Sequence, residues 1–352
     1  MKKTGRILKL VLVFSAAAVL LSGCGEDRRK YDQAGKDLEQ GSYEYALAEY
    51  LECVEQGLLP ARSLRGAGLS CLRLGRYQEA ADYFSRALGT EKLEKALRKD
   101  LLEYRATAYL RNGNYDQAMA DCQVLVAENG KDPQVLFLAG SVALAMDSYQ
   151  EASADFTEAY KNDSSYDMAL LIYEEYMSRG MEADGIGYLE TANSGEPKTA
   201  DDYCDQGRIH YYMGDYSAAA SSLSTAMNKG STEAILLLGM VYTAQNNIAN
   251  ARIMYEQYLN KGAGDAKAYN GLALCDIAEG SYDAALEHIA AGIKTSNTTE
   301  MQNLLFNEIV VYEKRLDFAT AKQKAEEYCI MFPDDQAAQE ELAFLKTRVG
   351  ES

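Results

Sequence analysis

The sequence predicts an all-α protein in which helical hairpins repeat along the chain. The 352 residues include only 4 prolines and no tryptophan, and they are rich in alanine, leucine and glutamate, a composition that favours helix throughout. In addition, one short motif recurs along nearly the whole chain, and several of its copies lie 34 residues apart. A fixed period of this length is typical of solenoids built from repeated pairs of helices.

The first 23 residues are expected to be a signal peptide that is removed. Four basic residues lie among the first nine, and Leu10 to Leu21 form a short run of apolar and small residues, which is the order found in such signals. As a helix this run would be about 18 Å long, well short of the roughly 30 Å hydrocarbon core of a bilayer. We therefore expect no lasting transmembrane helix here.

Cys24 ends the sequence Leu21-Ser22-Gly23-Cys24, which resembles the lipobox of bacterial lipoproteins. The resemblance implies that the Cys24 thiol carries a diacylglycerol, that the chain is cut just before it, and that residues 24–26 are a short tether. It places the protein outside the cytoplasm, held to a bacterial membrane by acyl chains, of which two give stable anchoring. The alternative is an ordinary secretory signal with a chance cysteine.

The charge of the chain argues against nucleic acid as a partner. Removal of residues 1–23 takes away four basic residues and no acidic one, so the formal net charge would change from −18 to −22. A protein this acidic repels phosphate backbones and anionic lipid head groups. We therefore expect no nucleic-acid binding, and membrane attachment only through the lipid on Cys24.

The recurring motif consists of a turn residue, a spacer, an aromatic or apolar residue and, three residues further on, an alanine. Glycine at the turn can adopt the positive φ that ends a helix, so each turn should separate a helix A from a helix B. The turn residues are Gly41, Gly75, Gly113, Asp147, Gly214, Asn246, Gly280 and Leu316.

Residue size follows the same repeat. Seven residues before a turn stands a small residue, such as Gly68 or Gly140, and nine residues after a turn stands a large one, such as Phe84 or Phe156. Small residues let helices A and B approach closely and pack ridges into grooves. The large residue is expected to fill the space toward the next repeat.

The period, the turns and the small positions together resemble the tetratricopeptide repeat, although the tryptophan of that family is missing. The resemblance implies a right-handed α-solenoid of about nine tetratricopeptide-type hairpins over residues 27–347, with a short tail at 348–352. The final helix, at about 335–347, is expected to be a capping helix that gives the stack a polar end. The repeats are expected at about 27–60, 61–98, 99–132, 133–165, 166–199, 200–231, 232–265, 266–301 and 302–334.

The fifth repeat departs most from the pattern. Tyr173 stands at its small position, and Gly180, Gly185 and Gly187 crowd its second half. Because a glycine costs roughly 1 kcal/mol inside a helix, a short or distorted helix B is expected. Residues 180–199 are then either a hinge between two blocks of repeats or a drifted repeat with a longer loop.

Six cysteines remain beyond the lipobox, and none forms a C-x-x-C pair or a cluster with histidine. We therefore expect no zinc or other metal site. An extracytoplasmic location permits disulfides, but Cys53 and Cys71 stand where other repeats have small or packing residues. We expect these two to be free, buried thiols that behave as small hydrophobes.

No catalytic constellation is recognisable, so we expect neither an enzyme nor a cofactor. The sequence contains no nucleophile elbow, phosphate-binding loop, zinc-protease motif or dinucleotide fingerprint, the patterns that would indicate such chemistry. His210 falls where other A helices have tyrosine and is expected to pack, whereas His288 lies on a solvent-prone flank of a helix B. The remaining catalytic alternative is a hydrolase with an unrecognised pair of carboxylates.

The candidates for a binding site lie on the A helices, which line the concave face in the family that the chain resembles. Arginines in so acidic a chain are suited to grip an acidic peptide or a glycan phosphate by bidentate contacts. The alternatives are that they only neutralise neighbouring carboxylates, or that binding uses the apolar, tyrosine-rich A helices of the fourth to seventh repeats. The candidate residues are Arg62, Arg65, Arg73, Tyr104, Arg111, Phe137, Arg208, Tyr211 and Tyr212.

From these features we expect a membrane-anchored scaffold of the bacterial cell envelope that binds a protein or peptide partner. The alternative is an accessory lipoprotein that regulates a cell-wall enzyme or a secretion or pilus-assembly machine. A fold of this kind supports binding and leaves the partner unnamed.

Overall fold

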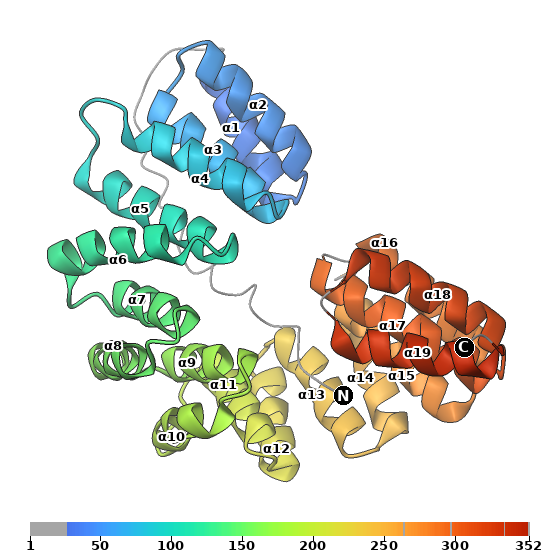
Figure 1. Ribbon diagram of the computed structural model, residues 1–352. Helices are drawn as coiled ribbons and strands as arrows, with labels where there is room; N and C mark the ends of the chain where they lie inside the picture. The colour runs from blue at the N-terminus through green and yellow to red at the C-terminus, as the bar shows by residue number, and fades with distance from the viewer. Residues whose placement is uncertain (1–26, 263–264, 296–297, 334, 351–352) are drawn as a thin grey trace. The chain divides into compact units, whose positions relative to one another are not determined.

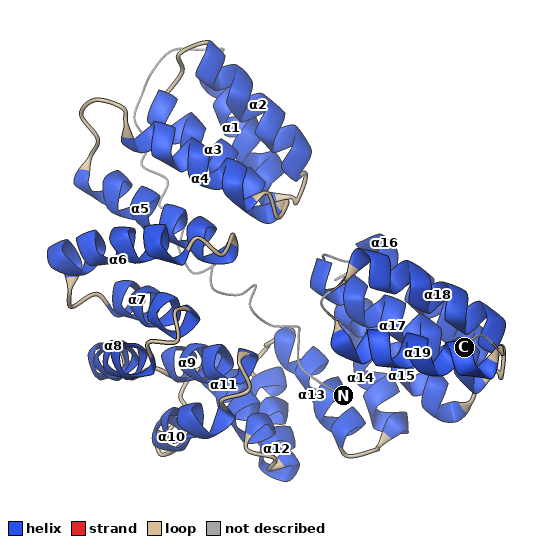
Figure 2. Ribbon diagram, in the orientation of Figure 1, coloured by secondary structure: helices blue, strands red, loops and turns tan. Residues whose placement is uncertain are grey.

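The computed structural model describes residues 27–262, 265–295, 298–333 and 335–350. Cys24 and the rest of the lipobox lie outside these residues. All regular secondary structure in the described part is α-helical, as Figures 1 and 2 show. Among the helices described, none is long and apolar enough to cross a membrane.

The described helices form nine hairpins and a single last helix, so the predicted all-α hairpin solenoid is confirmed. The hairpins begin within four residues of the expected repeat boundaries. The first eight helices are α1 Asp27–Glu39, α2 Tyr43–Glu55, α3 Pro60–Arg73, α4 Tyr77–Leu88, α5 Lys95–Arg111, α6 Tyr115–Asn129, α7 Pro133–Ala145 and α8 Tyr149–Asn162. The others are α9 Tyr166–Ser178, α10 Glu182–Asn193, α11 Ala200–Tyr212, α12 Tyr216–Asn228, α13 Glu233–Ala244, α14 Ile248–Leu259, α15 Ala266–Glu279, α16 Tyr282–Thr295, α17 Thr298–Lys314, α18 Phe318–Met331 and α19 Gln336–Arg348.

The chain divides into two compact units, which we call the N-terminal and the C-terminal unit. The N-terminal unit ends at Met168 and contains α1 to α8, whereas the C-terminal unit begins at Ala169, inside α9. From α1 to α8, and again from α10 to α19, each helix packs against the next one in the chain, and neighbouring A helices also touch, as α11 touches α13. The hinge expected at residues 180–199 stays a prediction.

The turn residues of the motif have the left-handed backbone that their positions demand. φ is +74° at Gly75 and at Gly280, and it is +58° at Asp147, +57° at Asn246 and +61° at Leu316. Glycine adopts this region without penalty and Asp or Asn tolerates it, whereas leucine rarely does. The backbone therefore forms the same turn whether or not the sequence supplies the favoured residue.

The predicted pairing of small and large residues is confirmed by close approaches between helices. A Cβ atom on Gly68 would lie 2.5 Å from the ring of Phe84, and one on Gly239 would lie 2.6 Å from the ring of Tyr255. The same Tyr255 ring lies 2.3 Å from the Cβ position of Gly271, on helix A of the following repeat. One large side chain thus fills space both within its own hairpin and toward the next hairpin.

The fifth repeat corrects one expectation. Its helix B, α10, runs unbroken over 12 residues, as do α4, α13 and α14, so a shortened or distorted helix was the wrong prediction. A Cβ on Gly185 would lie 3.1 Å from Cα of Tyr173 and 3.2 Å from Cβ of Tyr176. Gly185 stands where the other repeats have the motif alanine, and its missing side chain lets the large Tyr173 of helix A fit. The large position of helix B is still filled, by the fully buried Leu189.

The cysteines at packing positions are buried as expected. Cys53, Cys71 and Cys275 have no exposed surface, and Cys122 is 1 % exposed. Burial raises the pKa of Cys71 and of Cys122 to about 12, so these groups remain protonated thiols at neutral pH. Whether any pair is joined by a disulfide in the mature protein stays a prediction.

Candidate functional site

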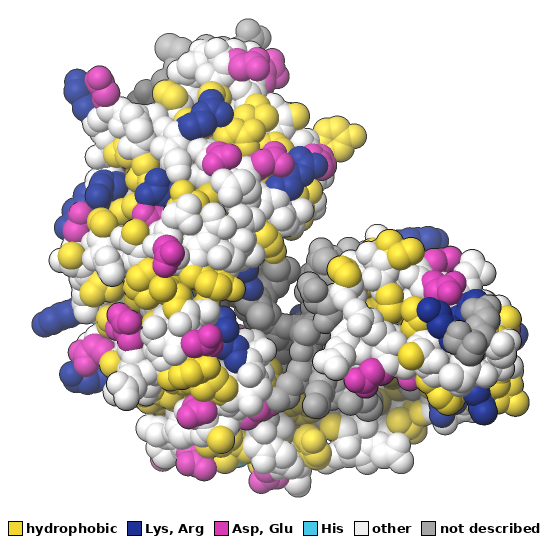
Figure 3. All heavy atoms as spheres, in the orientation of Figure 1, with side chains coloured by type: hydrophobic (Ala, Val, Ile, Leu, Met, Phe, Trp, Pro, Cys, Tyr) yellow, Lys and Arg dark blue, Asp and Glu magenta, His cyan; other side chains and the backbone are white. Residues whose placement is uncertain are grey.

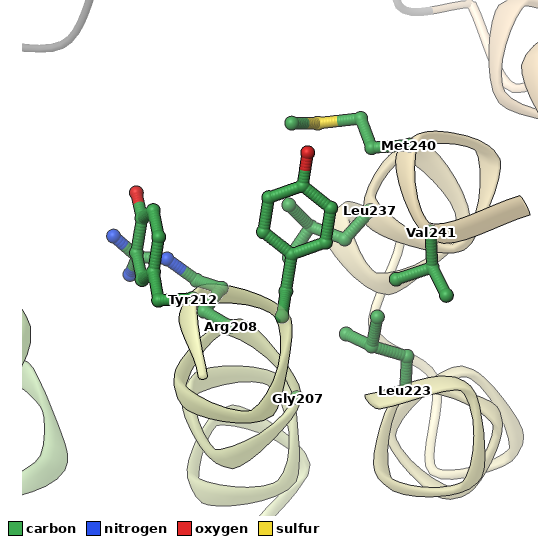
Figure 4. Close-up of a pocket in the computed structure, with 8 residues that line it drawn as sticks. Gly207, Arg208, Tyr212, Leu223, Leu237, Met240 and Val241 are labelled. Atoms are coloured by element: carbon green, nitrogen blue, oxygen red, sulfur yellow. The ribbon is translucent and has the colours of Figure 1, made fainter. Parts of the chain in front are cut away.

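A shallow depression lies among α11, α12 and α13 in the C-terminal unit, and its cavity volume is about 10 Å³, room for about one water molecule. Figure 4 shows Arg208 and Tyr212 side by side on α11, and Leu237 and Met240 on the neighbouring α13. Its wall is mostly apolar or aromatic, which is the lining that binding sites for side chains usually have. The lining residues are Gly207, Arg208, Tyr211, Tyr212, Leu223, Leu237, Met240 and Val241.

Local sequence fixes where α11 starts and how closely it approaches α12. The Thr199 hydroxyl accepts a bond from the Asp202 N–H at 3.0 Å, and the Asp202 carboxylate accepts one from the Thr199 N–H at 3.0 Å, which is a capping box. A Cβ on Gly207 would lie 2.5 Å from Cγ of Leu223. Glycine at this point therefore lets Leu223 form the floor of the depression.

Arg208 is bound by carboxylates of the protein itself. Its guanidinium donates to Glu174 at 2.9 Å and to Asp205 at 3.0 Å, and the Tyr212 hydroxyl donates to the same Glu174 oxygen at 2.7 Å. The side chains of Arg208 and Glu174 are only 11 % and 8 % exposed. Burial acts to lower the pKa of Arg208, but the carboxylates outweigh burial and raise it, so the guanidinium stays charged.

Tyrosine rings make up the other side of the depression. The ring centroid of Tyr212 lies 5.1 Å from that of Tyr173 and 5.9 Å from that of Tyr211, and Tyr211 lies 5.6 Å from Tyr216. These are the spacings of interacting aromatic pairs. The rings therefore hold one another in place and present a stiff aromatic wall beside Leu237.

In the N-terminal unit the predicted arginines also pair with carboxylates. Arg65 on α3 makes a bidentate ion pair with Asp100 on α5, with Nη2 2.9 Å from Oδ1, and its guanidinium lies 5.3 Å from the centre of the Tyr104 ring. Arg62 donates to Glu94 at 3.3 Å. Figure 3 shows basic and acidic side chains beside one another on the surface in view. The contacts at Arg62 and Arg65 are those of charge neutralisation.

The remaining candidates of this unit differ in exposure. Arg73 and Arg111, the last residues of α3 and α5, are half-buried. Phe137 is 3 % exposed and its ring lies 5.6 Å from Phe156, while Tyr104 is 5 % exposed. Phe137 and Tyr104 are therefore core residues rather than surface anchors, because Phe137 packs on helix B of its own hairpin and Tyr104 stacks on Phe84 in helix B of the preceding one.

The two histidines occupy different environments. Burial lowers the pKa of His210, against the opposing effect of Asp215, in keeping with the expected packing role. His288 is not simply solvated: its Nδ1 lies 2.6 Å from Asp276, a carboxylate that is 2 % exposed and also accepts from Arg252 at 2.7 Å. No group of three or more potential metal ligands occurs among the residues described.

The sequence-based prediction missed the carboxylates that pair with the arginines, although the repeat length of the sequence indicates where they stand. Glu174 precedes Arg208 by 34 residues and Asp100 follows Arg65 by 35. One repeat length therefore places opposite charges at adjacent positions on consecutive A helices. A search for charges one period apart would have found both pairs.

Comparison with known proteins supports the repeat. The family model of the tetratricopeptide repeat matches residues 31–92, 204–266 and 236–297, somewhat less than half of the chain. Tetratricopeptide repeats are therefore present in both units. No curated protein matches this sequence.

Solved structures with a similar fold share little sequence with this chain. Yeast Tom70 is 11 % identical, with a TM-score of 0.54 over 92 % of this chain and 82 % of that one. A tetratricopeptide repeat protein from Parabacteroides merdae is 18 % identical, with a TM-score of 0.45 over 71 % of this chain and 98 % of that one. Similarity at this level concerns the fold alone.

Proposed function

We propose that this protein is a lipid-anchored scaffold of the bacterial cell envelope that binds a protein partner. The observation that carries the binding surface is the depression between α11 and α13, whose apolar and aromatic wall is only partly covered by the protein itself. Tyrosine and methionine are enriched where partners bind, because they bury much apolar surface in a well-packed site. A protein segment that lays an apolar side chain over this shallow surface would remove Tyr212, Leu237 and Met240 from water.

The arginines are weaker candidates for the partner-binding surface than this depression is. Arg62, Arg65 and Arg208 each already pair with a carboxylate at 3.3 Å or closer. A partner would have to replace those ion pairs, so the net gain in free energy would be small. Apolar burial has no such competitor and contributes roughly 25 cal/mol for each Å² removed from water.

The location rests on the sequence. Four basic residues, a short apolar run and the Leu21-Ser22-Gly23-Cys24 sequence stand in the order of a lipoprotein signal, and the acyl chains on Cys24 would be the membrane anchor. A scaffold held in this way would bring its partner to the membrane surface.

Partner capture by paired variants tests the binding surface. Leu237→Ser and Met240→Ser each place a hydroxyl in the wall of the depression, whereas Ile253→Ser changes an apolar side chain of α14 that is 53 % exposed and does not line it. Pull-down from detergent-solubilised envelope should lose the captured protein with the first two variants and keep it with the third. Equal capture by all three would refute the proposed surface.

A further inference from the structure

Negative charge exceeds positive charge around the depression. Arg208 is the basic residue in its lining, and three carboxylates, those of Glu174, Asp205 and Glu233, act on its guanidinium. The four groups together carry a formal charge of −2. Because two of the carboxylates are held at 2.9 and 3.0 Å, this balance is fixed by the fold.

An acidic partner is disfavoured by the same contacts. A carboxylate from the partner would meet a guanidinium that is only 11 % exposed and is already paired with Glu174 and Asp205, so it would compete with both. If it displaced Glu174, that carboxylate, which is 8 % exposed, would lie buried without its cation, which is costly. Moreover, the incoming charge would approach a region that is already negative, where like charges repel.

A basic partner meets favourable groups instead. The Tyr211 and Tyr212 rings are half-buried and meet edge to face at an interplanar angle of 69°, so a cation near a ring face is attracted by its electron density. The aliphatic stem of a lysine or arginine can lie along Leu237 and Met240 while its charged end stays in water. The formal net charge of the whole chain, −18, would also draw a basic segment toward the surface.

We propose that the depression selects a basic amphipathic segment of a partner protein, in which an apolar side chain covers the depression between α11 and α13 and a neighbouring lysine or arginine lies against the tyrosine rings. This inference rests on the proposed function and adds the chemical class of the partner to it. It reverses the sequence-based expectation of an acidic peptide, because the cation in the wall is already neutralised.

Two matched fluorescent peptides test the selection. Both carry the same alternating leucine and phenylalanine residues, and the residues between them are lysine in one and glutamate in the other. Fluorescence anisotropy with the full chain in detergent should give at least about tenfold tighter binding of the lysine peptide at low salt, and the preference should shrink as salt screens the charges. Equal or tighter binding of the glutamate peptide would overturn the proposal.

Variants locate the preference in the depression. Glu174→Gln and, as a milder change, Asp205→Asn remove local negative charge and should reduce the preference for the lysine peptide severalfold. Glu190→Gln, on an exposed position of α10, removes the same net charge elsewhere and should leave the preference unchanged. If Glu190→Gln acts as strongly as Glu174→Gln, the selection belongs to the net charge of the chain and the proposal fails.

The outcome also separates this inference from the proposed function. If both peptides bind equally and Met240→Ser weakens both, the depression is a binding surface without charge selection, so only the present inference is wrong. If neither peptide binds, the inference is wrong, while partner capture with the Leu237→Ser and Met240→Ser variants still decides the proposed function. Circular dichroism of each variant confirms that a lost preference does not come from lost helix.

Discussion

Leu316 holds a backbone conformation that its side chain disfavours. Its φ is +61°, and the side chain is 74 % exposed, so the residue pays a conformational cost without contributing to the core. Leu316→Gly should therefore stabilise the C-terminal unit by about 1 kcal/mol. Urea unfolding should show a higher midpoint for the variant. Gly280→Leu, the opposite change at an equivalent turn, should lower the midpoint.

Glycines within helices have opposite roles that the structure separates. A Cβ on Gly239 would lie 2.6 Å from the Tyr255 ring, whereas one on Gly187 would meet nothing within 4 Å. Gly239→Ala should therefore destabilise the C-terminal unit by about 1–3 kcal/mol through overpacking. Gly187→Ala should stabilise it by about 0.5–1 kcal/mol, since it raises helix propensity. Thermal unfolding of the two variants, followed by circular dichroism, should give shifts of opposite sign.

Single residues also show where sequence-based prediction stops. The turn at Leu316 was predictable because the period of the motif marks it, whatever residue stands there. The burial of Phe137 and Tyr104 was not, because helical spacing tells which residues share a face but leaves open which neighbour covers that face. Glu174 was missed for a related reason. Its role is the ion pair with Arg208, and that pair forms only because two A helices are aligned side by side.

At the scale of an element, the end of the C-terminal unit is held by a pair of carboxyl groups. Glu313 on α17 lies beside Glu341 on the last helix, α19, and two adjacent carboxyl groups can share a hydrogen bond only when one of them is protonated. Burial is the main cause that raises the pKa of Glu313 to about 7, and Glu341 raises it further, against a smaller opposing effect of Lys314.

The sign of the pH dependence follows from this raised pKa. In the unfolded chain Glu313 would have its ordinary pKa of 4.5, so the folded state binds the proton more tightly and stability falls as pH rises from about 4.5 through 7. After allowance for solvent screening, we expect α19 and its hairpin to lose about 1–2 kcal/mol between pH 5 and pH 8.

Variants on neighbouring positions test this dependence. Glu313→Gln should flatten the loss of stability with pH, because the amide cannot ionise. Glu340→Gln, at an exposed position of α19 next to Glu341, should leave the pH dependence of stability unchanged. Hydrogen exchange of α19 amides at pH 5.5 and pH 8 measures the effect once each rate is divided into the intrinsic rate of an unfolded amide at the same pH, and weaker protection at pH 5.5 than at pH 8 would contradict the assignment.

At the scale of the whole molecule, the number of hairpins was predictable and the division into units was not. Eight copies of the motif, with one repeat length left open between Asp147 and Gly214, predict nine hairpins because each turn is a local event encoded within a few residues. The division at Met168 and Ala169 depends instead on how strongly successive hairpins pack, which sums many side-chain contacts between repeats. The crowded glycines of the fifth repeat drew attention to residues 180–199, yet α10 accommodates Gly185 by close packing against Tyr173.

The whole-molecule prediction concerns the anchor. Cys24→Ala removes the thiol that the proposed diacylglycerol would occupy, and the described helices offer no membrane-spanning segment in its place. The variant should therefore move from the membrane pellet to the supernatant after a high-salt wash, while its circular dichroism spectrum keeps the same helical signal. A high-salt wash is needed because charged contacts with membrane proteins are screened over about 10 Å or less at 0.1 M salt and above. Should the variant still sediment with membranes, either an uncleaved signal or a membrane-bound partner holds the protein. A second variant, Met240→Ser in the Cys24→Ala background, would tell these two apart. Sedimentation through a partner should be lost when the depression is altered, whereas sedimentation through an uncleaved signal should remain.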